Sequence, residues 1–380
     1  MNFISKYIKR DKSCLTNSSN FESLVKVKKF PVFFGVTDKK IEDDLYAEME
    51  WFIEPETGLI QLNNLIPLDI LYQEQHAYGF GKTWEDHYQE FSKFILKTNP
   101  SQVMEIGAGQ GRIAEITSSS DKIISWTIIE PNPTFRPTEK IQVIEGFFDE
   151  NYILEDSYDT YTFSHVLEHA YNPSEFLKCI WDKMRLNDNL IFSYPNLSVW
   201  LDKKFTNSLN FEHTIFLTKP HLVTLVENLG FEIVKIKSYL EHSHFFHLKK
   251  KSTKIQIKNY SNLYEINKSL LLKFIQYHYD EVNSINSKIK ELDGEVFLFG
   301  AHIFSQYLTV FGLETENIKY ILDNSVQKHD KRLYGTNLKT KSPKILKNYD
   351  SPTVILRAGP YNQEIKNDII KNINANTKFI

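Results

Sequence analysis

A glycine-rich segment offers the clearest chemistry in this sequence. Residues 103–112 read Val-Met-Glu-Ile-Gly-Ala-Gly-Gln-Gly-Arg, so that Glu105 stands two residues before the first of three alternating glycines, Gly107, Gly109 and Gly111. Glycine lets the backbone turn tightly and lets a ligand lie against it with no Cβ in the way. The spacing disfavours a nicotinamide dinucleotide and hence an oxidoreductase, because that loop carries its last glycine one residue later.

Further side chains with suitable chemistry follow at the ends of predicted strands. Residues 123–129 predict a buried strand that ends at Glu130, an acid placed to accept hydrogen bonds from ribose hydroxyls. The strand predicted at 141–149 carries Phe147 and Phe148 near its end, and aromatic walls suit an adenine ring. These groups together predict a nucleoside-containing ligand at the glycine segment.

The elements that must position these groups are strands alternating with helices. A helix with one apolar face is predicted at 85–96, before the glycine segment, and further buried strands begin at Tyr158 and Leu190. After a long helix at about 261–292, buried strands are predicted at 295–299, 318–322 and 353–357. The alternation predicts an α/β fold with a second, smaller parallel α/β unit. The first 75 residues predict only short β-like pieces, at 25–27, 32–36 and 59–62.

The glycine segment resembles motif I of the class I S-adenosylmethionine methyltransferases. The run Ser-His-Val-Leu-Glu-His at 164–169 is similar to a signature that follows the fourth strand of the same enzymes. In that family the acid and the glycine backbone hold the amino-acid end of the cofactor. The resemblance implies a Rossmann-like methyltransferase domain with S-adenosylmethionine as cofactor. It implies cofactor contacts from Glu105, Gly107, Gly109, Gly111, Glu130, Phe147, Phe148, Ser164 and His165.

The layout of the whole chain resembles the bacterial nucleotide-sugar C-methyltransferases. The C-terminal part of the resemblance lies in the segments 299–302, 322–325, 334–336 and 357–365. Members of that family methylate carbon 3 of a keto-deoxysugar carried on a nucleoside diphosphate. The resemblance implies a small N-terminal module at 1–75, a methyltransferase domain at 76–248 and a C-terminal Rossmann-like domain at 249–380 that contributes to substrate binding. It implies a nucleotide sugar as substrate, in surface-glycan or secondary-metabolite synthesis.

Two departures from that family affect the expected chemistry. Its N-terminal module normally carries a zinc site of paired Cys-x-x-Cys elements, which read Cys-Leu-Thr-Asn at 14–17 and Glu-Pro-Glu-Thr at 54–57 here. A structural zinc site needs four nitrogen or sulfur ligands, so we expect no zinc. The family's Tyr-x-Glu-His element reads Asn-Phe-Glu-His at 210–213, without the tyrosine. The acceptor atom, whether carbon, oxygen or nitrogen, therefore stays open.

Methyl transfer from a sulfonium needs alignment of the nucleophile and removal of its proton. We expect His213 to be the base, Glu212 to orient it, and His169 to lie near the cofactor sulfur, although a helix-cap or core role for His213 and a structural hydrogen bond for His169 are alternatives. Substrate contacts are expected from Tyr72, Tyr78, Asn210 and Asp323. The tyrosines have packing as an alternative, and Asp323 has the capping of a turn.

A second group of histidines, His242, His244 and His247, suggests a metal. On a strand, however, alternate side chains point to opposite faces, which leaves at most two of the three together. We therefore expect no metal.

Composition excludes several classes of function. The chain has 380 residues, a net charge of −3, 41% hydrophobic residues and 24% charged residues, which gives no case for binding nucleic acid or membrane. Its two cysteines, Cys14 and Cys179, make a disulfide framework implausible and favour a reducing cytoplasm. A monomer or weak homodimer is expected. The rival functions are a non-catalytic nucleotide-sugar binding paralogue and an O- or N-methyltransferase of another small molecule.

Overall fold

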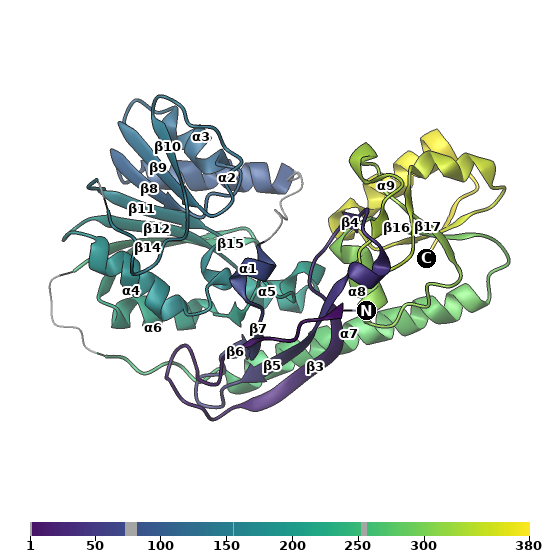
Figure 1. Ribbon diagram of the computed structural model, residues 1–380, viewed down its shortest axis with the longest axis horizontal. Coiled ribbons are helices and arrows are strands. Elements are labelled where there is room, and N and C mark those ends of the chain that lie inside the picture. Colours follow the sequence, from purple (N-terminus) through teal and green to yellow (C-terminus); the bar gives the residue numbers. More distant parts are fainter. Residues whose placement is uncertain (1, 73–81, 155, 252–256) are drawn as a thin grey trace.

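The computed structural model describes residues 2–72, 82–154, 156–251 and 257–380. Tyr78, one of the expected substrate contacts, lies outside these residues. Figure 1 shows two α/β units at opposite ends of the molecule, with the N-terminal strands and one long helix running beneath and between them. None of the helices in the described segments combines the length and the apolar composition needed to cross a lipid bilayer.

The central unit is built on a seven-stranded sheet in the order β10-β9-β8-β11-β12-β15-β14. The strands are β8 Gln102–Ile106, β9 Ser125–Glu130, β10 Ile141–Glu145, β11 Thr160–Ser164, β12 Asn189–Pro195, β14 Phe231–Tyr239 and β15 Ser243–Lys250. The first five strands of that order are parallel, and β15 runs antiparallel to both β12 and β14. The chain winds outward from β8 to β10 and then returns to β11 on the other side of β8. In sheets of this kind ligands bind beyond the carboxyl ends of the strands at such a reversal.

Helices cover both faces of this sheet. They are α2 Lys82–Leu96, α3 Arg112–Ser118, α4 Pro173–Lys183, α5 Leu197–Asp202 and α6 Lys219–Asn228. On one face, Phe91 and Phe94 of α2 and Ile113 of α3 pack with Trp126 and Phe245 of the sheet. On the other face, buried apolar residues of α4 and α6 join the large core of the molecule. The apolar face predicted for 85–96 is therefore confirmed as the buried side of α2.

Local sequence explains where these helices begin and end. Asn172 precedes α4 and accepts the backbone N–H of Glu175, while Pro173 occupies the first helical position, where a missing N–H costs nothing. Gly230 follows α6 with a φ of 92°, the left-handed conformation in which helices often end. These local signals fix the boundaries of the elements that flank β12 and β14.

The N-terminal strands form a sheet that includes a strand from the central unit. The order is β1-β5-β6-β13, with β3 also paired to β5. The strands are β1 Asn2–Phe3, β3 Glu22–Pro31, β5 Leu45–Ile53, β6 Ile60–Leu62 and β13 Ile215–Phe216. Two shorter pairings join β2 Ile8–Lys9 to β7 Asn64–Leu65, and β4 Val36–Thr37 to β18 Arg332–Leu333. The helix α1, Leu68–Leu71, follows the last of the N-terminal strands.

The segments 13–17 and 54–57, at the edge of this sheet, meet through a buried carboxylate. Glu54 is fully buried and accepts hydrogen bonds from the hydroxyls of Ser13 at 2.9 Å, Thr57 at 2.5 Å, and Thr16. The neighbouring Cys14 Sγ lies 3.7 Å from the backbone carbonyl of Tyr171. A carboxylate with three hydroxyl donors is well satisfied and holds the two turns together. Packing and this hydrogen-bonded cluster together hold the N-terminal turns in place.

The C-terminal unit is a five-stranded, wholly parallel sheet in the order β19-β17-β16-β20-β21. Its strands are β16 Val296–Phe299, β17 Ile318–Leu322, β19 Thr340–Lys341, β20 Thr353–Leu356 and β21 Lys378–Phe379, and its helices are α8 Ile303–Val310 and α9 Asn362–Asp368. The predicted strands at 295–299, 318–322 and 353–357 are confirmed. The winding reverses between β16 and β20.

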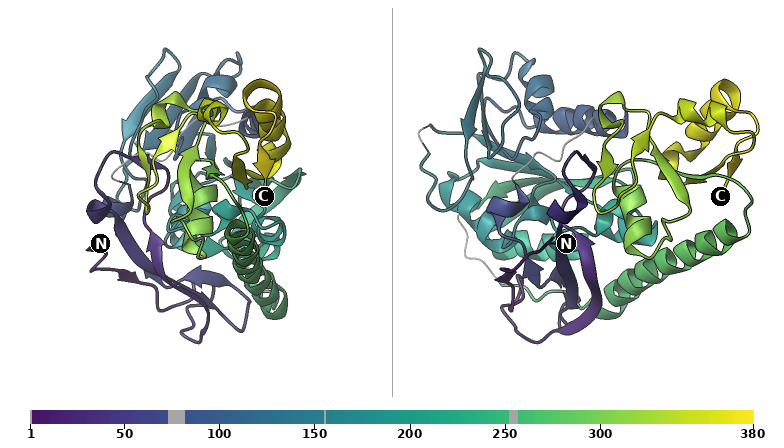
Figure 2. Two further views of the ribbon diagram at one scale, coloured as in Figure 1. Left: turned by 90° about the vertical axis from the view of Figure 1, so that its right-hand side faces the viewer. Right: turned by 45° about the vertical axis from the view of Figure 1, so that its right-hand side comes forward.

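The long helix α7, Tyr264–Lys290, spans the distance between the N-terminal strands and the C-terminal unit (Figure 2). Near its start, Asn267 Nδ2 donates to the carbonyl of Gly58 at 2.8 Å. Near its end, Asn286 Nδ2 donates to the carbonyl of Gly312 at 2.9 Å. Buried side chains from all three parts belong to one continuous core.

Candidate active site

The glycine segment forms the turn between β8 and α3. All three glycines have positive φ, at 70° for Gly107, 54° for Gly109 and 69° for Gly111, which side chains with a Cβ rarely adopt. A Cβ at Gly107 would lie 2.7 Å from Val166 Cγ2, whereas a Cβ at Gly109 would meet nothing within 4 Å. The middle of the turn therefore faces open space, as a turn that supports a ligand requires.

Glu105 is buried on β8, 1% exposed, and accepts a hydrogen bond of 2.9 Å from the indole Nε1 of Trp126. Burial raises the pKa of its carboxyl to about 8; the hydrogen bond from Trp126 opposes this shift, and the nearby Glu130 adds to it. The group is therefore largely protonated at neutral pH. A cationic ligand group beside it would favour the carboxylate.

Glu130, at the end of β9, meets the glycine turn directly. Its Oε2 accepts the backbone N–H of Gly109 at 3.0 Å, and its Oε1 accepts that of Asn132 at 3.1 Å. A carboxylate accepts about four hydrogen bonds, so each oxygen keeps a free lone pair for a hydroxyl of a ligand. The predicted proximity of the acid to the glycines is present.

The aromatic pair after β10 divides into two environments. Phe147 is 52% exposed, whereas Phe148 is buried and packs on Tyr152 and Phe176 with ring centroids 5.5 and 6.4 Å apart. At the end of β11 the buried hydroxyl of Ser164 has no hydrogen-bond partner among the described residues. The exposed ring, the open Gly109 and this unsatisfied hydroxyl fit a nucleoside-containing cofactor along the β8 and β11 strand ends.

Beyond β11 the chain brings together Glu168, His169 and His213. One ligand atom from each lies within 4.8 Å of the others, and the two imidazole centroids are 5.1 Å apart. His169 Nδ1 lies 3.9 Å from Glu212 Oε2. Burial lowers the pKa of His213 to about 4, and His169 lowers it further while Glu168 raises it. His213 is therefore neutral at physiological pH and able to accept a proton.

Glu168 is the residue that sequence reasoning missed. It is 1% exposed, its oxygens have no hydrogen-bond partner among the described residues, and its Oε1 lies 3.3 Å from His165 Nδ1 and 4.0 Å from His169 Nε2. Burial raises its pKa, and the two neighbouring histidines His169 and His213 lower it. The sequence feature that could have indicated this role is an acid in the run 164–169 that has a histidine on either side of it. A buried carboxylate of this kind is typical of a site that handles protons.

The turn that carries Glu212 and His213 is held by Asn210. Its Oδ1 accepts the backbone N–H of Glu212 at 2.8 Å and of His213 at 2.6 Å, and its Nδ2 lies 3.4 Å from His213 Nδ1. Asn210 was expected to contact substrate. In the structure its side chain shapes the turn and lies beside the imidazole, and its contact with substrate stays a prediction.

Groups from the other two parts of the chain fix this turn from both sides. Arg10, which is 7% exposed, donates to the carbonyl of Thr214 at 2.8 Å and to that of Tyr171 at 2.6 Å. The hydroxyl of Tyr307, on α8, accepts the N–H of Leu209 at 2.8 Å and donates to its carbonyl. The catalytic turn is therefore positioned by N-terminal and C-terminal elements as well as by its own.

The remaining expected substrate contacts lie apart from one another. Burial raises the pKa of the Tyr72 hydroxyl, and the nearby Glu212, Glu130 and Glu168 add to this shift. The backbone carbonyl of Tyr72 accepts a hydrogen bond of 3.1 Å from Nδ2 of Asn132. Asp323 follows β17 in the C-terminal unit and accepts the backbone N–H groups of Ala301 and Ser325, both at 2.9 Å. The turn-capping alternative for Asp323 is therefore realised, and its contact with a ribose stays a prediction.

Comparisons with known proteins agree with this geometry. Residues 72–236 match a family model described as a methyltransferase domain. Among solved structures, the match to human N-acetylserotonin methyltransferase has 17% identity, covers 45% of this chain and 53% of that one, and has a TM-score of 0.38. An O-methyltransferase family protein from Burkholderia thailandensis matches with 12% identity, 45% and 57% coverage and a TM-score of 0.37. No curated protein sequence matches.

The family match assigns the segment that holds the glycine turn, Glu130 and the acid–histidine cluster. The strand order of this segment, and the helices on both faces of its sheet, are those of a Rossmann-like α/β domain. Residues 72–236 are a methyltransferase domain with the class I Rossmann-like fold, and the cofactor of such a domain is S-adenosylmethionine.

Proposed function

We propose that the acceptor is a sugar carried on a nucleoside diphosphate, and that Glu168, His169 and His213 remove the proton that the acceptor loses. The observation that carries this proposal is the buried acid–histidine cluster at the carboxyl end of β11, held by elements of all three parts of the chain. A proton acceptor there suits an acceptor carbon next to a ketone, and equally an acidic hydroxyl or amine.

The cofactor supplies an electrophilic methyl group on a sulfonium. The chain supplies the base: neutral His213 takes the acceptor proton on a ring nitrogen, and the carboxylate of Glu168 balances the imidazolium that results. Glu212, beside His169, orients that second imidazole. The acceptor, having lost a proton, would form a bond to the methyl carbon as the bond from sulfur to that carbon breaks, which leaves the thioether S-adenosylhomocysteine. The proton on His213 leaves to solvent after turnover.

A nucleotide moiety is supported by the C-terminal unit. It is a second parallel sheet whose winding reverses between β16 and β20, and Asp323 and the Gly300 turn lie at the strand ends beside that reversal. Such strand ends are the usual place for a nucleotide in an open α/β sheet. Direct attachment of α8 to the catalytic turn through Tyr307 couples that sheet to the chemistry. On this proposal the enzyme would act in the synthesis of surface glycans or secondary metabolites, in a reducing cytoplasm.

The test is incubation of the full chain with isotope-labelled S-adenosylmethionine and a panel of nucleotide-activated sugars, with and without a keto group, read by mass spectrometry. We expect one labelled methyl group on a keto-sugar nucleotide, and fragmentation then locates it on carbon, oxygen or nitrogen. Cofactor binding with no transfer to any member of the panel would favour a non-catalytic binding paralogue. Transfer only to small molecules without a nucleotide would overturn the proposed substrate.

A further inference from the structure

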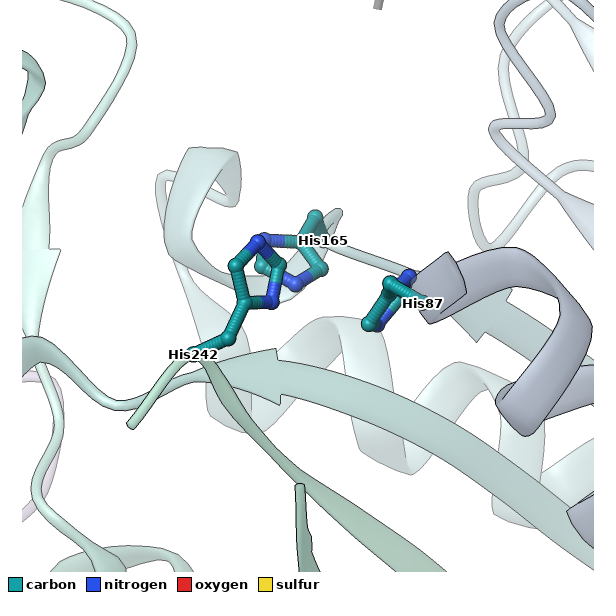
Figure 3. A group of neighbouring side chains, drawn as sticks. All are labelled: His87, His165 and His242. Carbon is teal, nitrogen blue, oxygen red and sulfur yellow. The ribbon is translucent and has the colours of Figure 1, made fainter. Parts of the chain in front are cut away.

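Three histidines from distant segments meet close to Glu168, whose Oε1 lies 3.3 Å from Nδ1 of one of them, His165. His87 lies on α2, His165 directly follows β11, and His242 lies in the turn between β14 and β15 (Figure 3). One ring nitrogen from each lies within 4.8 Å of the other two. A zinc ion about 2.0–2.1 Å from three nitrogens sets them about 3.3 Å apart, so small side-chain rotations close the set.

The protonation of the three imidazoles suits metal binding. Burial lowers the pKa of each, to about 3 for His165 and His242, and their mutual repulsion lowers the pKa of His87 and His242 further. A neutral imidazole is the form that binds metals. Nδ1 of His87 is buried and has no hydrogen-bond partner within the described segments.

Outer contacts resemble those that orient metal-bound histidines. Ser193 Oγ lies 2.9 Å from Nε2 of His87, and Ser243 Oγ lies 2.9 Å from Nε2 of His165 and 2.5 Å from Nδ1 of His242. Hydroxyls and carboxylates beside the second nitrogen of a histidine fix its ring and tautomer. The hydroxyl of Ser243 therefore links two of the three imidazoles.

Simple packing explains the arrangement less well. Trp84 lies edge-on to the rings of His165 and His242, with ring centroids 4.8 and 4.7 Å apart. Aliphatic side chains in place of these two histidines would pack against Trp84 equally well. His165 adopts a φ of 55°, a conformation that is uncommon for a residue with a side chain and that concentrates at functional sites. The cluster therefore keeps a strained backbone in order to present an imidazole.

We infer that His87, His165 and His242 bind a divalent cation of the zinc class. Three neutral imidazoles and an open position are the ligand set of catalytic zinc sites. His165 Nδ1 is 3.3 Å from Glu168, and Trp200 packs against His165, His242 and His213, so the cation lies beside the proton-accepting cluster. Its role, which rests on the proposed function, would be to hold an oxygen of the acceptor. The binding itself does not depend on that function.

This site differs from the one considered in the sequence. His244 Nδ1 lies 3.0 Å from Ser238 Oγ, and His247 Nε2 lies 2.8 Å from Asn189 Oδ1, so neither joins His242. The expectation of no metal was drawn from His242, His244 and His247, and the present inference departs from it. His87 and His165 are 78 residues apart in the sequence, so no short motif contains both of them.

The test is the titration of chelator-treated full-length protein with Zn²⁺ by calorimetry and with Co²⁺ by visible absorption. We expect one ion per chain and, for cobalt, the intense d–d bands of a four-coordinate site. His242→Asn and His165→Asn should weaken Zn²⁺ binding by at least about 10–100-fold, the loss that removal of even an outer contact causes. Asn suits the positive φ at position 165. Circular dichroism establishes that the variants fold.

The control is His247→Gln, which removes a nearby histidine outside the cluster and should leave binding unchanged. Absence of Zn²⁺ and Co²⁺ binding to the folded protein would overturn the inference. Equal binding by the His242 and His165 variants would overturn it as well. Binding that is lost instead in His169→Asn, and kept in the two cluster variants, would place the metal at the other group and contradict this assignment. None of these readouts requires methyl transfer, so a failed acceptor assay leaves them interpretable.

Discussion

At the scale of single residues, the acid–histidine cluster makes the most direct prediction. His213→Asn keeps the shape of the side chain but removes the proton acceptor, and we expect kcat to fall about 10²–10⁴-fold, the usual contribution of a positioned base. Cofactor affinity should be unchanged, because His213 is not at the glycine turn. His244→Asn, which alters a histidine held by Ser238, is the control for activity. Normal turnover by the His213 variant would remove it from the mechanism.

Glu105 gives a prediction about the cofactor itself. Because burial raises its pKa to about 8, the carboxyl is mostly protonated at pH 7, and the ammonium group of bound S-adenosylmethionine should favour its ionised form. Binding at pH 7 is therefore expected to release a proton, measured as a dependence of the calorimetric heat on the ionisation enthalpy of the buffer. Glu105→Gln should abolish the release and weaken binding about ten- to a hundredfold, the loss of a charged hydrogen bond. The exposed Glu145→Gln serves as control. Proton release that persists in the Glu105 variant would assign it to another group.

At the scale of elements, the contact between α8 and the catalytic turn is testable. Tyr307→Phe removes the hydroxyl that bonds both backbone groups of Leu209 and leaves them buried and unsatisfied, a loss of about 1–3 kcal/mol. We expect faster hydrogen exchange at Leu209 to His213 and a lower kcat. Tyr161→Phe is the matched control, because that buried hydroxyl also donates to a carbonyl, of Lys183 at 3.2 Å, away from the site. Equal effects of both variants on kcat would mean that the Tyr307 contact contributes only to the stability of the fold.

Sequence periodicity predicted the elements whose signal is local. The helix at 85–96 and the strands around β9, β10, β12 and β17 were predicted because apolar runs and their flanking polar residues are contiguous. β5 was not predicted: its buried positions alternate with the acids Glu48 and Glu50, and the strand is stabilised by pairing with β3 and β6. β13 has only two residues and forms by pairing with a strand about 155 positions earlier, as the register Ile215 to Gln61 shows.

The candidate site divides in the same way. The glycines, Glu130 and His213 were found from motifs, since each lies in a short recognisable segment. The cluster of His87, His165 and His242 could not be found, because it depends on how α2, β11 and the β14–β15 turn fold against one another. The role of the Asn210 side chain likewise depends on the geometry of its turn, because it accepts backbone N–H groups two and three residues later. The residue type at position 210 does not by itself predict that geometry.

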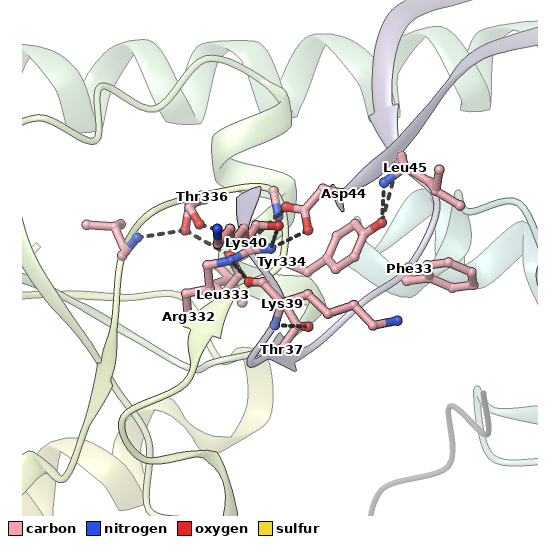
Figure 4. A network of polar contacts seen from close by, with 12 residues as sticks. Phe33, Thr37, Lys39, Lys40, Asp44, Leu45, Arg332, Leu333, Tyr334 and Thr336 are labelled. Atoms are coloured by element: carbon pink, nitrogen blue, oxygen red, sulfur yellow. Dashed lines mark hydrogen bonds and ion pairs between the residues drawn. The ribbon is translucent and has the colours of Figure 1, made fainter. Parts of the chain in front are cut away.

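At the scale of the whole molecule, an ion pair joins the N-terminal sheet to the C-terminal unit (Figure 4). Arg332 donates two hydrogen bonds to the fully buried carboxylate of Asp44, at 2.7 and 2.5 Å, and Gly335 N–H donates a third at 2.8 Å. Asp44→Asn should destabilise the protein by about 3–5 kcal/mol, since it leaves a buried guanidinium without its counter-charge. Asp182→Asn, which breaks the exposed pair with Lys178, is expected to change the free energy of unfolding by less than about 1 kcal/mol. If urea unfolding gave comparable losses of stability for both variants, the buried ion pair would not be the stronger contribution expected here.

Buried histidines spread over the whole chain determine its stability in acid. Burial lowers the pKa of His278 from 6.5 to about 4, as it does for His213 and His247, so the unfolded chain binds more protons than the folded one between these values. Stability is therefore complete above about pH 6.5 and is lost as pH falls toward 4, with each such histidine contributing on the order of 3 kcal/mol. Urea unfolding measured across this range should show the decline. His278→Leu, in the aromatic pocket of Phe274, Tyr307 and Phe311, should flatten the slope by the contribution of one group. An unchanged slope in this variant would mean that the acid sensitivity arises at the other histidines.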